Sequence, residues 1–191
     1  MILGILSDTH GFARRAAAAM RILEHKGATA FIHCGDIGGE EVLDELIGRQ
    51  AWCVFGNTDA QDGSLRRYAE SIGVLVADGP LVIEMKKKQI AIFHGHETRF
   101  SQLTRVLRLR DHSALVALTQ GWDYVCYGHT HHASDIRVGR MRLINPGALE
   151  RARVRTIATL DLDQDELAYW CVDEFASPDE APRRVYPRDL A

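Results

Sequence analysis

Side chains of the kinds that bind metal ions recur along the chain, and most of them stand beside a glycine. They occur in five fragments, Asp8-Thr9-His10, Gly35-Asp36, Gly56-Asn57, His94-Gly95-His96 and Gly128-His129-Thr130-His131. Taken singly, Gly-Asp and Gly-Asn pairs are typical of turns, and an isolated Asp-x-His is common by chance. Turns do not require histidine, however. The ordered set therefore predicts a metal centre with carboxylate, amide and imidazole ligands.

Each fragment follows a short apolar run that is typical of a buried β-strand. These runs cover residues 2–6, 30–32, 52–55, 89–93 and 124–127. Loops at the carboxyl ends of strands in α/β folds converge on one crevice. We therefore expect the polar fragments to meet in space. Apolar residues at helical spacing predict helices over residues 13–25, 40–47, 101–110 and 113–119.

From residue 74 onward the pattern changes to strands joined by short turns. A hairpin is expected over residues 81–84 and 89–93, and further strands near Ile136 and Leu143 and over residues 156–162 and 166–172. A chain of 191 residues suits one domain. We predict this domain over residues 1–175 and an extended tail over residues 176–191, which contain three prolines.

Composition narrows the classes of partner and compartment. The net charge of -3 argues against a stable nucleic-acid partner. No apolar run approaches the ~20 residues that span a bilayer, and the N-terminus lacks the features of a signal peptide, so no membrane contact is expected. The four cysteines are scattered and never form C-x-x-C, which favours reduced thiols and a cytoplasmic location. Whether the chain forms a homo-oligomer is left open.

Taken in order, the five fragments resemble the motifs of the calcineurin-like metallophosphoesterase superfamily. The resemblance spans about residues 1–150, and Asn145-Pro146-Gly147 closes it as in small single-domain bacterial and archaeal phosphodiesterases. It implies an α/β sandwich of two mixed β-sheets flanked by α-helices. It also implies that Asp36 bridges two metal ions, one bound by Asp8, His10 and His131 and the other by Asn57, His94 and His129.

The resemblance further implies hydrolysis of a small phosphodiester or nucleotide-like substrate by a metal-activated hydroxide. Two cations a few ångströms apart can activate a water and neutralise charge on the phosphoryl oxygens. Oxygen and imidazole ligands suit Mn²⁺, which we expect, as well as Ni²⁺, Fe²⁺, Co²⁺ or Zn²⁺. Phosphomonoester or pyrophosphate substrates remain alternatives. A protein-binding module on the same scaffold is a further alternative, although its ligand positions are expected to be eroded.

Thr58 departs from the pattern of many relatives. They carry a histidine there as a general acid, with an acidic residue next to it that Asp59 would match. Threonine cannot replace an imidazole as an acid near pH 7, so the sequence predicts a preference for good leaving groups. His96 is a candidate general acid or substrate contact. We expect Thr58, Asp59, His33 and His132 to support the ligands.

Three arginines, Arg14, Arg15 and Arg99, follow ligand-bearing fragments. They could meet a second phosphate group of a substrate. A solvated helix face is the simpler expectation for all three.

Overall fold

The strands of this computed structural model, which describes residues 1–59, 63–175 and 181–187, form two mixed β-sheets. The larger sheet has the order β12-β11-β10-β1-β2-β3-β4, and the smaller sheet has the order β5-β6-β7-β9-β8. In chain order, the strands are β1 (Ile2–Leu6), β2 (Ala28–His33), β3 (Ala51–Val54), β4 (Leu75–Ala77), β5 (Leu81–Met85), β6 (Lys88–Ile92), β7 (Tyr124–Cys126), β8 (Ser134–Val138), β9 (Met141–Asn145), β10 (Thr156–Asp161), β11 (Glu166–Cys171) and β12 (Arg184–Val185).

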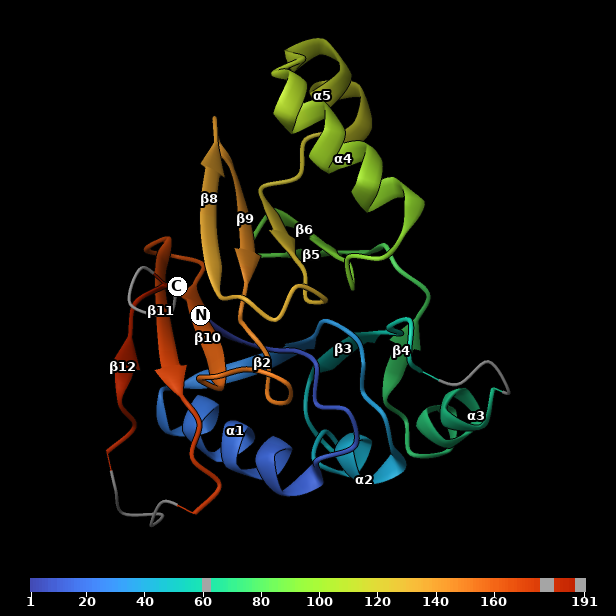
Figure 1. Ribbon diagram of the computed structural model, residues 1–191, viewed down its shortest axis with the longest axis vertical. Helices are drawn as coiled ribbons and strands as arrows, with labels where there is room; N and C mark the ends of the chain where they lie inside the picture. Colours follow the sequence, from blue (N-terminus) through green and yellow to red (C-terminus); the bar gives the residue numbers. More distant parts are fainter. Residues whose placement is uncertain (60–62, 176–180, 188–191) are drawn as a thin grey trace.

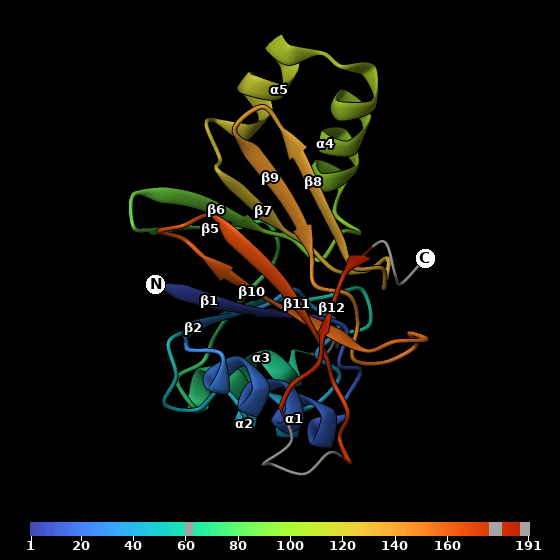
Figure 2. The ribbon, with the colours of Figure 1, turned by 90° about the vertical axis from the view of Figure 1, so that its left-hand side faces the viewer.

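Helices cover the outer faces of both sheets, as Figures 1 and 2 show. Three helices lie against the larger sheet and two against the smaller one. They are α1 (Ala13–His25), α2 (Glu40–Asp44), α3 (Ser64–Ser71), α4 (Thr98–Leu109) and α5 (His112–Thr119). The predicted sandwich of two mixed sheets flanked by helices is confirmed. Among the described helices, none is both long and apolar enough to cross a bilayer.

Three layers of apolar side chains hold the sandwich together. Side chains of β1 such as Leu3 and Ile5 point between the two sheets and pack with Ile90 and Ile144 of the smaller sheet. A second layer joins the larger sheet to α1, where the alanine-rich face includes Ala16 and Ala19. A third layer lies under α4 and α5. The central strands are therefore buried on both faces, which explains their continuous apolar runs.

Parallel strands in each of the two sheets bring the polar loops to a common edge. In the larger sheet β1, β2 and β3 run parallel, and in the smaller sheet β6 and β7 do. Their carboxyl ends therefore open toward the same region, as α/β folds require for a site. The core fixes these ends, because residues such as Leu6 and Ile92 are almost fully buried.

The structure differs from the sequence prediction mainly in short elements. Helix α3 was not predicted, because only Leu65 and Ala69 are buried on it and such a pattern is weak. Helix α2 ends at Asp44, three residues before the predicted end. Strand β12, inside the predicted tail, pairs antiparallel with β11. Two parts of that predicted tail, residues 176–180 and 188–191, lie outside the described residues.

Candidate metal centre

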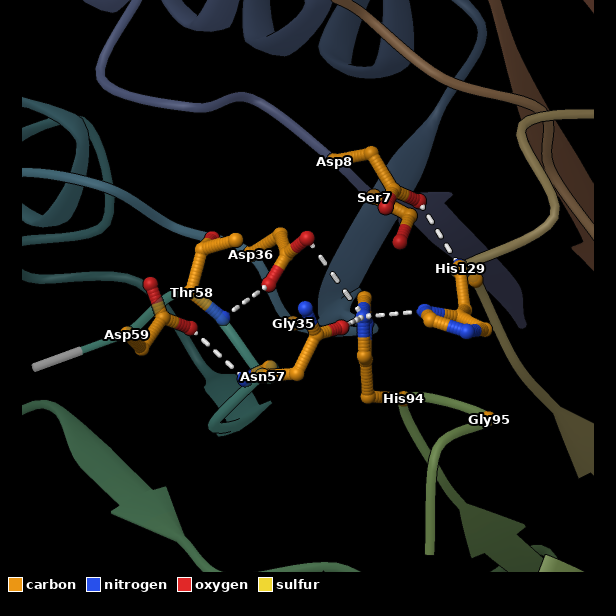
Figure 3. Close-up of polar contacts among 12 residues, drawn as sticks. Ser7, Asp8, Gly35, Asp36, Asn57, Thr58, Asp59, His94, Gly95 and His129 are labelled. Carbon is orange, nitrogen blue, oxygen red and sulfur yellow. Dashed lines mark hydrogen bonds and ion pairs between the residues drawn. The ribbon is translucent and has the colours of Figure 1, made fainter. Parts of the chain in front are cut away.

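All seven side chains predicted as metal ligands come together where the parallel strands end. Asp8 and His10 follow β1, and Figure 3 shows Asp8 facing the loops that carry Asp36, His94 and His129. The groups that could hold a cation are Asp8 with His10 and His131, and Asp8 with Asp36 and His94, because the ligand atoms of each group lie within 4.8 Å of one another.

Asp36 lies between the two sets of ligands. Its Oδ1 accepts a hydrogen bond from the backbone N–H of Thr58 at 2.9 Å. Its Oδ2 lies 3.5 Å from His94 Nε2 and 3.6 Å from His10 Nε2. One oxygen is therefore fixed by the backbone, and the other faces a histidine from each set. This is the arrangement that a carboxylate shared by two cations needs.

The remaining ligands complete the two sets. On one side, Asp8 Oδ1 lies 3.1 Å from His131 Nε2. On the other side, His94 Nε2 lies 3.0 Å from Asn57 Oδ1 and 3.2 Å from His129 Nδ1. His94 is held by its other ring nitrogen, since Nδ1 lies 2.8 Å from the carbonyl oxygen of Cys34 and donates to it. Its Nε2 is thereby left as the nitrogen with a free lone pair.

Two buried polar atoms of this cluster lack hydrogen bonds. They are Asp8 Oδ1 and His10 Nε2, and the only other such side-chain atom among the described residues is Glu174 Oε2. Buried polar atoms without partners are rare and costly in folded proteins. A bound divalent cation would satisfy both atoms, and their oxygen and nitrogen donors match its chemistry. The residues present therefore fit a metal site.

The charges in the cluster are strongly coupled. Burial alone would raise the pKa of Asp36, but hydrogen bonds from His94 and Thr58 outweigh it and lower that pKa well below its ordinary value. Burial would lower the pKa of His94, yet the adjacent Asp36 raises it. Burial raises the pKa of Asp8 and lowers the pKa values of His10 and His129. Lower pKa values favour the neutral, metal-binding form of His10 and His129, whereas His94 is the imidazole that shares charge most closely with Asp36.

Five of the seven ligand residues have a left-handed backbone conformation. Their φ angles lie between 47° and 66°, and the residues are Asp8, His10, Asp36, His129 and His131. Residues with a Cβ rarely adopt this conformation, and where it persists it often marks a functional site. Each loop thereby turns sharply enough to aim its side chain inward directly after the strand.

The glycines of the motifs allow this close approach. A Cβ on Gly56 would lie 2.1 Å from Asp36 Oδ1, and a Cβ on Gly128 would lie 2.0 Å from Ser7 Oγ and 2.6 Å from Asp8 Oδ2. No side chain fits in that space. The glycines beside the ligands are therefore needed for packing of the loops as well as for turning the chain.

Asp59 joins two ligand loops. Its Oδ1 accepts the backbone N–H of Gly38 at 2.8 Å, and its Oδ2 accepts that of Gly56 at 2.7 Å. Burial raises the pKa of this carboxyl. Each oxygen accepts a backbone N–H from a different loop, so Asp59 ties the two loops together.

His33 supports the first ligand loop. Its Nδ1 accepts the N–H of Gly35 at 3.2 Å, so its Nε2 carries the proton and donates to Thr9 Oγ1 at 2.9 Å. Thr9 in turn donates to the carbonyl oxygen of Ile37 at 2.9 Å. The residue between two predicted ligands is thus tied to the second loop.

The other predicted supporting residues differ in position. Thr58 is exposed and contacts Asp36 through its backbone. His132 is bonded through its ring to the carbonyl oxygen of Thr130, and within the described residues its side chain has no hydrogen bond or ion pair to the seven ligands. His96 is exposed, with its ring 5.3 Å from that of His94.

Sequence reasoning missed Glu97, which accepts the N–H groups of His94 and Gly95, both at 2.7 Å. An acid at the start of a helix after the histidines was its only signal.

The sequence led us to expect Arg15 on a solvated helix face, but in the structure it does not lie on one. Only 12% of its side chain is exposed, and it pairs with Glu150 and Glu174. Arg14 is exposed, with its guanidinium over the ring of Phe175. Arg99 donates to the carbonyl of Leu118. Among the described residues, none of the three contacts the predicted ligands.

Comparison with known proteins identifies the class. Residues 1–165 match the calcineurin-like phosphoesterase superfamily domain, and the chain belongs to this superfamily, whose members bind divalent metals. It is a metal-dependent phosphoesterase. Among its relatives is a phosphodiesterase of Methanocaldococcus jannaschii, which is 29% identical over 87% of this chain and 96% of that protein. A probable metallophosphoesterase of Bacillus subtilis is 27% identical over 84% of each chain.

Solved structures agree with this assignment. An archaeal phosphodiesterase superposes with a TM-score of 0.73 at 27% identity and covers 90% of this chain and 99% of its own. A phosphoesterase from E. coli has a TM-score of 0.62 at 17% identity and covers 98% of this chain and all of its own. A zinc complex of Vps29 from Entamoeba histolytica has a TM-score of 0.58 at 20% identity, with 97% and 98% covered. The last two show the fold alone.

Proposed function

We propose that the chain hydrolyses phosphodiesters with two divalent metal ions held by the seven converging ligands. The observation that carries this proposal is the position of Asp36 Oδ2, which lies at nearly equal distances from His10 and His94. A phosphodiesterase among the relatives supports the preference for diesters. When bound, two cations supply an activated water as nucleophile and positive charge for the phosphoryl oxygens.

The seven ligand side chains fall into two sets, one for each ion. Asp8, His10 and His131 would hold one ion, and Asn57, His94 and His129 the other, with Asp36 shared. Asn57 is a neutral ligand, so the second ion keeps more of its positive charge for the substrate than a third carboxylate would allow. The backbone N–H of Thr58 keeps Asp36 oriented.

The position of His96 makes it a candidate substrate contact or general acid. It lines a cavity of about 200 Å³ together with Asp59, Arg66 and Glu97. Because Asn57 and Thr58 are exposed at the site, the substrate can approach from this side. Thr58 itself cannot supply a proton near pH 7, which favours substrates with acidic leaving groups.

We further propose Mn²⁺ as the metal, with Ni²⁺, Fe²⁺, Co²⁺ and Zn²⁺ as alternatives for the same donors. The substrate is a small phosphodiester or nucleotide-like molecule. No stable nucleic-acid partner is proposed, since the net charge is -3. A cytoplasmic location is supported by four free thiols, three of them buried.

A substrate and metal panel tests the proposal. Cyclic nucleotides, dinucleotides, glycerophosphodiesters and bis(4-nitrophenyl) phosphate are each assayed with five metals and with a chelator. We expect turnover of diesters that is highest with Mn²⁺ and lost with the chelator, and slower turnover of 4-nitrophenyl phosphate. Activity on the monoester alone would change the reaction class. No turnover with any metal would favour the binding module.

A further inference from the structure

Two arginines beside the metal centre have no acidic partner among the described residues. Arg151 and Arg153 are exposed and line a cavity of about 210 Å³ that also contains His131 and His132. Within the described part of the chain, neither forms an ion pair or a side-chain hydrogen bond. Nearby Arg15 and Arg155, in contrast, both pair with Glu174.

The loop that carries these arginines is fixed against the ligand loops. The backbone N–H of Glu150 donates to the carbonyl oxygen of Asp8 at 3.0 Å, and the carbonyl of Arg151 lies 3.5 Å from His131 Nδ1. Leu149 is fully buried, and its carbonyl accepts a hydrogen bond from Arg15 at 3.3 Å. The position of Arg151 next to the predicted ligands is therefore set by the fold.

The backbone at Arg151 is itself unusual. Its φ angle is 55°, in the left-handed region that residues with a Cβ rarely adopt. The same conformation occurs at five of the predicted metal ligands. A residue held in this conformation directly beside the site is one whose position the surrounding structure determines.

The two cavities that flank the metal centre differ in charge. Among the residues that the structure describes, no carboxylate lines the cavity of Arg151 and Arg153. The cavity beside His96 is lined by Asp59, Asp78 and Glu97, and its one arginine, Arg66, pairs with Asp78 at 2.9 Å. A substrate with a second negative group is therefore attracted on the His131 side and repelled on the His96 side.

We propose that Arg151 and Arg153 form an anion subsite, and that the preferred substrates are phosphodiesters that carry a second phosphate group. This inference rests on the proposed phosphodiesterase activity and names its substrate class. Guanidinium groups suit this role because their forked donors bind phosphate oxygens in pairs and remain charged at all working pH values. The cavity gives the second phosphate room while the diester lies at the metal ligands.

A matched pair of substrates tests the subsite. They are the 4-nitrophenyl ester of thymidine 5′-phosphate with and without a phosphate on the 3′ hydroxyl. Wild type should prefer the 3′-phosphorylated ester. The double variant Arg151→Gln/Arg153→Gln should lose about tenfold or more in kcat/KM on that ester, mainly through KM, and less than about twofold on the other. Arg105→Gln/Arg108→Gln, two exposed arginines of α4, controls for the change in net charge.

Binding gives a second readout that needs no turnover. By calorimetry with Mn²⁺ present, wild type should bind thymidine 3′,5′-bisphosphate more tightly than thymidine 5′-phosphate, and the double variant should lose this difference. An equal loss on both esters, or an unchanged binding difference in the variant, overturns the subsite. If wild type cleaves neither ester with any metal, the proposed activity fails, and the binding comparison still decides whether the arginines form an anion subsite.

Discussion

His33 donates a hydrogen bond from Nε2 to Thr9 and accepts one at Nδ1 from the backbone N–H of Gly35. Only the neutral imidazole with its proton on Nε2 can make both bonds. The imidazole is almost fully buried, and burial lowers its pKa from the ordinary 6.5 to about 3. Protonation at Nδ1 would remove the acceptor that Gly35 needs. A buried histidine that must stay neutral thus connects the first two ligand loops.

This arrangement predicts that acid destabilises the fold through His33. In the unfolded chain the imidazole binds a proton below pH 6.5, but in the folded chain it does not until about pH 3. Stability from this residue is therefore complete above pH 6.5 and is lost as pH falls toward 3. Between pH 7.5 and 5.0 the expected loss is about 2 kcal/mol.

Urea unfolding of the metal-free protein at both pH values measures the effect. His33→Gln, which keeps a donor and an acceptor but has no titration, should lose less stability on acidification than wild type by about that amount. Equal losses in the two proteins would contradict the neutral state of His33. A chelator must be present throughout, since metal affinity also depends on pH.

Metal analysis should find close to two ions per chain after saturation with Mn²⁺. Removal of Asp36, the carboxylate between the sets, should weaken both ions, because Asp36→Ala takes a ligand from each. His131→Ala should weaken only the ion held with Asp8 and His10. Calorimetric titration separates the two cases. A single ion in wild type under saturating metal would disprove the dinuclear arrangement.

Activity should collapse when a ligand is removed, while the fold stays largely intact. His94→Ala is expected to reduce diester hydrolysis by roughly 10³-fold or more, because loss of metal-activated water costs several kcal/mol of barrier. His112→Ala, an exposed histidine at the start of α5, is the matched control and should keep near-normal turnover. Circular dichroism checks folding. Near-normal turnover in His94→Ala would favour a binding role for the scaffold.

The rate of hydrolysis should depend more strongly on the leaving-group pKa for this enzyme than for relatives with a histidine at position 58. Thr58→His should speed up poor leaving groups selectively, since a positioned general acid contributes about 10² to 10⁴-fold. The gain is expected to be partial, because both oxygens of Asp59 already accept backbone N–H groups, which fix the carboxylate in a position set by the loops and not by an imidazole. The slope of log rate against leaving-group pKa measures this. A flat slope in wild type would mean that an acid is present, with His96 as the first residue to substitute.

The sequence predicted the class of fold and the residues at the strand ends, because short apolar runs and ligand-type side chains alternate in it. Residue type and order alone predicted that Asp36 and His94 would belong to one site, and the structure brings them together. Their mutual distances were not predicted, since these depend on how two sheets pack. Helix α3 (Ser64–Ser71) was missed because it buries few residues.

Residues that act through their backbone or their surroundings were also beyond prediction from residue type. Thr58 orients Asp36 through its N–H, which any residue but proline would provide. Arg15 and Arg151 are both arginines near the site, yet within the described ranges Arg15 pairs with glutamates and Arg151 pairs with no acidic residue. That difference comes from contacts between segments more than a hundred residues apart.

The left-handed backbone of five ligand residues has a consequence for how the metal-free protein tolerates mutation. Glycine adopts this conformation without strain, while alanine does not, so His131→Gly should be more stable than His131→Ala by about 1 kcal/mol. At Val116, an exposed residue in the middle of α5, the order should reverse, because alanine favours a helix over glycine by a similar amount. Urea unfolding of the four variants in chelator measures both differences. At these ligand positions the residue that best suits the backbone therefore differs from the residue that the proposed metal site needs. Substitution by glycine would favour the left-handed backbone but remove the ligand, and with it the proposed activity.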